Sequence, residues 1–193
     1  MSLTIFVAMP LFLGGLSGAL DKNPRVRIET SLGSIEVEID AKHAPATAAN
    51  FLRYVEAGRY SGGRFHRTVT MQNQPDKKIK IEVIQGGVNP TFEKQDFPAI
   101  DLERTNVTGL HHLNGTISMA RDGADTATSD FFICIGPQPE LDFGGKRNPD
   151  SQGFAAFGQV RKGMEVVRKI QKSKAEDQGL KPPIDILSIK RIP

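Results

Sequence analysis

The chain has 193 residues, of which 38% are hydrophobic and 24% are charged, and its formal net charge is +3. These values indicate one soluble globular domain of ordinary size, and they exclude disordered and coiled-coil chains. Basic residues gather between residues 161 and 181 without interleaved aromatic residues. We therefore expect a solvated surface there and no nucleic-acid partner.

Residues 1–20 differ in kind from the rest of the chain. Leu3 to Leu20 carries no charge, and Ser17-Gly18-Ala19 supplies small residues of the kind that signal peptidases cut after, although no Lys or Arg precedes the apolar run. We expect a signal peptide or its remnant, and hence a periplasmic or secreted protein, with a cytoplasmic location as the alternative. The rival interpretation is a membrane or chain–chain contact through residues 3–20. Residues 21–193 are expected to form the folded domain.

The first predicted elements are two strands and a helix. Residues 25–29 and 34–39 alternate apolar with charged side chains, which predicts two half-buried strands joined by a turn at 30–33. Helical spacing follows, with Pro45 suited to the first turn and Gly58 to the end of the helix. The apolar positions of this helix are Ala48, Phe51, Leu52 and Val55.

Short strands dominate the remainder of the chain. They are predicted over residues 64–69, 79–85, 116–119, 131–135, 155–160 and 186–192. A second helix is predicted after Gly163, with Met164, Val167 and Ile170 on its apolar face. Residues 71–78 and 143–151 have the composition of loops. Many short strands with few helices favour an all-β barrel or sandwich.

Four short motifs follow one another along these strands. They are Phe65-His66-Arg67, Ile84-Gln85-Gly86-Gly87, Ile117-Ser118-Met119-Ala120 and the segment 129–134. None of them forms a nucleophile, a metal cluster or a phosphate-binding loop. A lone arginine beside an apolar pocket is typical of chemistry that needs electrostatic positioning and no covalent step.

Other candidate sites are weak. Ser129 has no identifiable base, and Gly144-Gly145-Lys146 lacks the spacing and the hydroxyl of a P-loop. His111 and His112 diverge if they lie on a strand, and no third ligand is evident, so we expect no metal. Cys134 lies in an apolar run and is expected to be a core residue.

In this order, the four motifs resemble those of the cyclophilins, a family of peptidyl-prolyl cis–trans isomerases, and the resemblance extends from Arg25 to Ile192. It implies a mainly β fold, a closed eight-stranded antiparallel barrel capped by two α-helices, with no cofactor. It also implies that proline-containing polypeptides are the partners, through assistance to protein folding. Residues 71–78 and 143–151 are similar to loop insertions of bacterial members.

The resemblance also implies the roles of individual residues. Arg67 matches the catalytic arginine, and Phe132 matches the floor of the proline pocket, with Leu141 on a wall and Val83 as a smaller contact. Gln85 is expected to hold the substrate carbonyl or to orient the arginine. The remaining expected substrate-binding residues are Ala120, Arg121, Asp130 and Phe154.

Some positions depart from the family pattern. Asp130 stands where a glutamine is usual, and Phe154 where a groove histidine is expected. Glu82 falls where a pocket phenylalanine is expected, so Met71 or another insertion residue is predicted to fill that space. Glu140 replaces a tryptophan associated with tight cyclosporin binding, so we expect weak cyclosporin binding. These departures leave open an alternative, a low-activity module that binds proline-containing segments.

Overall fold

The computed structural model describes residues 23–92 and 94–193. The expectations for residues 1–20 therefore lie outside the described residues. Within the described part of the chain, no helix is long and apolar enough to span a bilayer.

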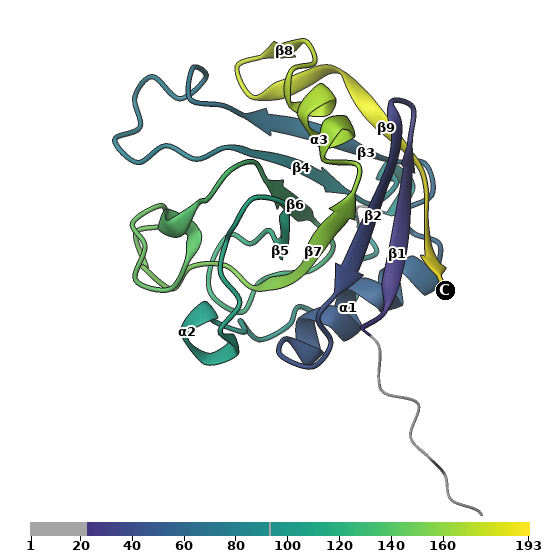
Figure 1. The fold of residues 1–193 in the computed structure, drawn as a ribbon, viewed down its shortest axis with the longest axis horizontal. Helices are drawn as coiled ribbons and strands as arrows, with labels where there is room; N and C mark the ends of the chain where they lie inside the picture. Colours follow the sequence, from purple (N-terminus) through teal and green to yellow (C-terminus); the bar gives the residue numbers. More distant parts are fainter. Residues whose placement is uncertain (1–22, 93) are drawn as a thin grey trace, which may run out of the picture.

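Eight antiparallel strands form a closed barrel, as predicted (Figure 1). Their order around the barrel is β1-β2-β7-β5-β6-β4-β3-β9, and β9 pairs with β1 to close the ring. A two-residue strand, β8 (Ala175–Glu176), pairs with β9 outside this ring. The barrel strands are β1 (Arg25–Thr30), β2 (Gly33–Ile39), β3 (Gly63–Val69), β4 (Val83–Gly87), β5 (Thr116–Met119), β6 (Phe131–Cys134), β7 (Ala156–Lys162) and β9 (Gly179–Ile192).

Both predicted helices are present, α1 (Pro45–Glu56) and α3 (Met164–Gln171), and Figure 1 shows them on opposite sides of the barrel. A third helix, α2 (Thr105–Thr108), was not predicted because four residues are too few to show a hydrophobic period. Two 3₁₀ turns, η1 (Pro90–Phe92) and η2 (Pro139–Leu141), complete the elements.

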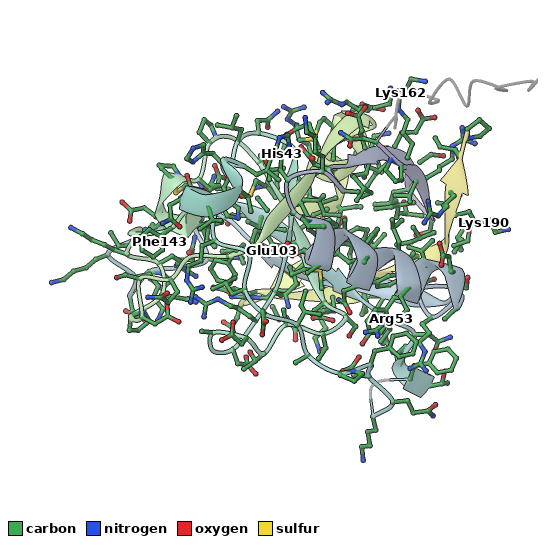
Figure 2. The ribbon with its side chains drawn as sticks, turned by 90° about the horizontal axis from the view of Figure 1, so that it is seen from below. His43, Arg53, Glu103, Phe143, Lys162 and Lys190 are labelled. Carbon is green, nitrogen blue, oxygen red and sulfur yellow. The ribbon has the colours of Figure 1, made fainter. Side chains whose placement is uncertain are left out.

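The N-terminus of α1 is capped by a residue distant in sequence. Glu103 accepts hydrogen bonds from the backbone N–H groups of Ala46 and Thr47 at 3.1 and 2.8 Å. Figure 2 shows Glu103 beside one end of the helix, with Arg53 further along it. A carboxylate at this end satisfies otherwise unpaired N–H groups and complements the helix dipole, so the loop that carries Glu103 is tied to α1.

Phe131 and Phe132 divide the hydrophobic core in two, because neighbouring residues of a strand face opposite ways. Phe131 is fully buried in the barrel, where the rings of Phe51, Tyr60 and Phe65 surround it at centroid distances of 5.5–5.8 Å. Phe132 belongs to a smaller cluster on the outer face of β4 and β6. That cluster contains Val69, Ile81, Val83, Phe132, Cys134 and Leu141, with Ala120 and Phe154 packed against it.

Two strand boundaries differ from the prediction by more than two residues. β4 begins at Val83 instead of Ile79, because the side-chain amide of Gln74 takes the place of a partner strand. Gln74 donates to the Ile81 carbonyl at 2.8 Å and accepts from the Ile81 N–H at 3.4 Å. β9 begins at Gly179 instead of Ile186, although Pro182 and Pro183 interrupt its hydrogen-bonding pattern.

The central position of Phe131 gives a test of the barrel core. We expect Phe131→Ala to lower the free energy of unfolding by about 3–5 kcal/mol, because it leaves a cavity among three aromatic rings. Val107→Ala is the control, since Val107 is 80% exposed and its truncation should change stability little. Denaturant unfolding followed by circular dichroism measures both, and equal effects would contradict this description of the core.

Candidate active site

A bulge in β3 places Arg67 on the outer face of the barrel. Phe65 lies opposite Gly86 on β4 and is fully buried, whereas Arg67 lies opposite Gln85, and the register shifts between the two. The extra residue is His66. In a regular strand, residues two positions apart face the same side, so Arg67 would point into the barrel together with Phe65. The bulge reverses this and directs the guanidinium of Arg67 outward.

Four residues from adjacent strands form a continuous row across this face. Arg67 of β3 pairs with Gln85 of β4, Gln85 pairs with Phe132 of β6, and Phe132 pairs with Ser118 of β5. Directly opposed residues in an antiparallel sheet have Cβ atoms about 4.5–5.5 Å apart. The row therefore joins a cation, an amide and an aromatic ring over a short distance.

Two glutamines fix the guanidinium of Arg67. Nη1 donates to Oε1 of Gln85 at 2.9 Å, while Nε and Nη2 donate to Oε1 of Gln178 at 2.9 and 2.6 Å. Burial lowers the pKa of Arg67, but an arginine stays protonated across the ordinary pH range. Because both acceptors are neutral amides, they orient the positive charge without cancelling it.

The carboxylate of Asp130 orients the side-chain amide of Gln85. Nε2 of Gln85 donates to Oδ2 of Asp130 at 2.9 Å, and Nε2 of His66 lies 3.4 Å from the same oxygen. A carboxylate only accepts hydrogen bonds, so it selects the NH₂ group of Gln85 and leaves the amide oxygen for Arg67. Asp130 therefore acts through Gln85 on the orientation of Arg67.

The apolar part of the site is a walled hollow over Phe132. This ring is 5% exposed, and the ring of Phe154 packs edge-on against it at a centroid distance of 5.3 Å. Arg121 lies over the other ring, with its guanidinium carbon 5.1 Å from the Phe154 centroid, and it is paired with Asp150 at 2.7 and 3.0 Å. The guanidinium of Arg121 is thus held by Asp150 and by the ring of Phe154, and it supports the side of the pocket that Phe154 forms.

A single cleft of about 1160 Å³ contains every residue predicted for the site. The structure brings them together from three strands, β3, β4 and β6, and from the β5–β6 and β6–β7 connections, but their roles toward a substrate stay predictions. The predicted residues that line the cleft are Arg67, Val83, Gln85, Ala120, Arg121, Asp130, Phe132, Leu141 and Phe154.

Of the two options predicted for the space near Glu82, Met71 or another insertion residue, Met71 is wrong. Met71 is 45% exposed and does not line the cleft. Ile81 lines it instead and packs in the cluster around Phe132. The carboxylate of Glu82 is on the other side of the strand, where it accepts a hydrogen bond from Gln171 of α3 at 3.1 Å.

A buried hydrogen-bonded chain lies beneath Phe132, and no local sequence pattern marks it. Oγ of Ser118 lies 2.9 Å from Nε2 of His112, and Nδ1 of His112 lies 2.6 Å from Oδ1 of Asp142. The imidazole stacks on Phe132 with an interplanar angle of 15°. Ser118 is fully buried and His112 is 1% exposed, so this arrangement supports the pocket floor and is closed to a substrate.

The charges in this chain are set by burial and hydrogen bonding. Burial lowers the pKa of His112, although its bond to Asp142 opposes the shift, so the ring is neutral near pH 7. Burial alone would raise the pKa of Asp142, but hydrogen bonds from His112 and His111 outweigh it and bring the pKa below its ordinary value. Both histidines are thus bonded to Asp142, and residues 23–92 and 94–193 contain no group of three or more ligating side chains suited to a metal.

Two further sets of residues at the site carry no signal that the sequence predictions used. Gln178, which accepts two hydrogen bonds from Arg67, lies in the turn between β8 and β9, and nothing in its local sequence marks it. The loops 71–80 and 143–151 add four cations to the cleft lining. These are Lys77, Lys78, Lys146 and Arg147.

Comparisons with known proteins agree with this architecture. Residues 25–191 match the family described as cyclophilin type peptidyl-prolyl cis-trans isomerase/CLD. The peptidyl-prolyl cis-trans isomerase A of Dickeya dadantii is 37% identical over 162 residues, which cover 83% of this chain and 78% of that protein. A peptidyl-prolyl cis-trans isomerase of Acinetobacter baylyi is 35% identical over 188 residues, which cover 93% of each protein.

A solved structure supports the fold. The crystal structure of a Cryptosporidium parvum cyclophilin type peptidyl-prolyl cis-trans isomerase superposes with a TM-score of 0.71 and covers 89% of this chain and 98% of that one. At 23% identity, this likeness concerns the fold alone. Since the family match and the two bacterial relatives span most of the chain, the protein belongs to the cyclophilin-type peptidyl-prolyl cis–trans isomerases.

Proposed function

We propose that this isomerase lowers the barrier to rotation about Xaa-Pro bonds through Arg67, while the pocket over Phe132 holds the proline ring. The observation that carries the proposal is the row in which Arg67, Gln85 and Phe132 occupy paired positions on three adjacent strands. A proline seated on the ring of Phe132 has its peptide bond within reach of the guanidinium. We further propose that the activity assists the folding of client proteins.

The reduction in the rotation barrier that this reaction needs is within the range of electrostatic catalysis. Rotation about a peptide bond is opposed by its partial double-bond character, with a barrier of about 18–20 kcal/mol. Uncatalysed exchange before proline takes tens to hundreds of seconds, so turnover in the ordinary enzymatic range needs the barrier lowered by roughly 3–7 kcal/mol. A few charge-assisted hydrogen bonds made only in the transition state supply energies of this order.

The chemistry of the twisted amide explains why a cation is useful. Rotation removes the conjugation of the C–N bond and localises a lone pair on the prolyl nitrogen. Nη1 and Nη2 of Arg67 each carry a second N–H that can be donated to this nitrogen or to the carbonyl oxygen. Such a bond stabilises the twisted state more than either planar state, which is the condition for catalysis.

The alternative is a module that binds proline-containing segments with little turnover. The observation that favours it is that Arg67 already donates three hydrogen bonds to Gln85 and Gln178. Under this alternative the cleft is the same and only the rate enhancement is absent. The Cryptosporidium parvum isomerase was also crystallised in the presence of the dipeptide Ala-Pro.

We also propose a periplasmic or secreted location and assign the domain to residues 21–193. The location rests only on the apolar composition of Leu3 to Ala19, which lie outside the described residues. N-terminal sequencing of the protein from its native host tests it, and an intact Met1 in all of the material would contradict a cleaved signal.

The role of Arg67 is tested by substitution. We expect Arg67→Ala to lower kcat/KM for an Xaa-Pro peptide by about 10²–10³-fold, and Arg67→Lys to recover only part of the loss because a lysine lacks the planar fork. Arg25→Ala is the control, since it removes the same charge from an exposed arginine of β1. A protease-coupled isomerisation assay measures all three. Peptide binding without any rate enhancement in the unsubstituted protein would favour the binding module.

Gln178 is expected to position Arg67. Removing it in Gln178→Ala leaves Nε and part of Nη2 without their acceptor, and we expect kcat to fall by about tenfold, since hydrogen bonds to charged groups contribute about 1.5–3 kcal/mol. KM should change little because the apolar pocket is intact. Gln95→Ala, an exposed glutamine on another loop, is the control. A rise in KM at constant kcat would assign Gln178 to binding and contradict its positioning role.

Cyclosporin should inhibit this isomerase only weakly. Glu140 occupies the position of the tryptophan linked to tight binding, and its carboxylate accepts a hydrogen bond from the backbone N–H of Lys146 at 2.8 Å. Glu140 does not line the cleft, so no large apolar side chain is offered from this position. Inhibition at nanomolar cyclosporin in the isomerisation assay would contradict this expectation.

A further inference from the structure

Two loops far apart in sequence join into one wall of the cleft. Nη1 of Arg147 donates to Oε1 of Gln74 and to the carbonyl of Ile79, both at 2.8 Å. Gln74 is itself buried and donates to the Thr70 carbonyl at 2.6 Å. Figure 1 shows the two loops, residues 71–80 and 143–151, projecting on the same side of the barrel. We call this pair of loops the insertion wall.

The insertion wall contributes cations to the cleft and no carboxylate that lines it. Its lining charges are Lys77, Lys78, Lys146 and Arg147. Two carboxylates of the wall, Asp76 and Asp150, do not line the cleft, and Asp150 is paired with Arg121. Glu140, next to the wall, accepts from the backbone of Lys146 and faces a neighbouring hollow.

The charges that the insertion wall adds to the cleft lining are all positive, whereas the carboxylates of the lining lie at the other end, together with the cation Arg64, which pairs with Gly87. The loop 70–82 enters β4 at Val83, which pairs with Cys134, so the insertion wall lies at this end of the β4–β6 ladder. Asp130 precedes Phe131, which pairs with Gly86 at the other end, and the remaining acidic lining residues, Asp96 and Asp122, come from loops that adjoin Asp130. The Arg67–Gln85–Phe132 row lies between the two ends.

Arg147 of the wall and Arg67 line the same cleft and influence one another electrostatically. Burial lowers the pKa of Arg147, and the positive charge of Arg67 lowers it further. Arg147 is partly buried and the three lysines beside it are exposed. Neighbouring cations repel one another, and an anion placed among them relieves that repulsion. A carboxylate that docks there therefore gains more than it would beside a single exposed lysine.

We propose that the insertion wall is a subsite for anionic side chains, so that this isomerase prefers proline-containing segments with a glutamate or aspartate close to the proline. This inference rests on the proposed binding of proline over Phe132. Gln85 and Val83 are two residues apart on β4, or about 7 Å, so a carboxylate about two or three residues from the proline reaches the wall in an extended peptide. The preference applies to the side of the proline that lies over the Val83 end.

The expected size of the preference is modest because the lysines are solvated. An exposed pair of opposite charges at about 4 Å gains at most on the order of fivefold in affinity, and two such pairs multiply to at most about 25-fold. Because solvation weakens each pair, we expect a total preference of about five- to tenfold. Salt screens these interactions, with a Debye length of about 10 Å at 0.1 M ionic strength. The preference should therefore shrink as salt is added, whereas the activity toward a neutral peptide should not.

The experiment compares peptides that differ only by glutamate or glutamine at each position flanking the proline. The full chain is assayed for kcat/KM, and calorimetry gives the dissociation constant for each peptide. The test variant is Lys77→Gln/Lys78→Gln/Lys146→Gln, which spares Arg147 because that residue joins the loops. The matched control is Lys169→Gln/Lys172→Gln/Lys190→Gln, which removes the same charge from exposed lysines outside the cleft.

We expect the unsubstituted protein and the control variant to favour the glutamate peptide by about five- to tenfold at one or more positions on one side of the proline. The test variant should have the same kcat/KM and dissociation constant for both peptides while retaining its rate toward the glutamine peptide.

Equal kcat/KM and equal dissociation constants for both peptides in the unsubstituted protein would overturn the subsite and leave the proposed function standing. Loss of the preference in the control variant would also overturn it, by assigning the effect to net charge. If neither peptide is isomerised, the proposed catalytic function fails, and the ratio of the two dissociation constants still decides the subsite.

Discussion

The bulge at His66 is the constraint on which the rest of this site depends. Phe65 belongs to the barrel core and Arg67 to the outer face, although strand alternation would direct both the same way. One extra residue reconciles a packed interior with an outward guanidinium. The register also shifts at this point on the other side of β3, where Phe65 pairs with Ile184 and Arg67 with Gly179, but there the surplus residues, 180–183, belong to β9. The turn that carries Gln178 is thereby brought next to Arg67.

A short chain of hydrogen-bonded polar groups then fixes the orientation of the Arg67 guanidinium. Asp130 selects the NH₂ end of the Gln85 amide, Gln85 presents its oxygen to Arg67, and Gln178 accepts from the far side of the guanidinium. The arginine is fixed by neutral acceptors, so its charge is available to a substrate. On the apolar side, His112 stacks under Phe132 as a neutral ring, which supports the floor without placing a second cation beneath it.

The sequence predicts the strands, both main helices and the cleft residues of the strands well, because each leaves a local signal. The alternation in residues 25–39 and the helical spacing from Ala48 to Val55 are examples, and the four motifs identified the outward row. The role of Gln74, the chain from Ser118 to Asp142 and the contact of Arg67 with Gln178 could not be predicted. These contacts join residues that are distant in sequence, up to 111 positions apart for Arg67 and Gln178, and they carry no local pattern. Met71 was misplaced for the same reason, since only the path of the loop decides whether Met71 or Ile81 meets Phe132.

The most direct test of this account is a crystal structure of the protein with a bound Xaa-Pro peptide. The account predicts the proline ring against Phe132 and a nitrogen of the Arg67 guanidinium about 2.7–3.2 Å from the prolyl nitrogen or the preceding carbonyl oxygen. A proline bound elsewhere in the cleft, or an Arg67 side chain directed away from the peptide bond, would contradict it.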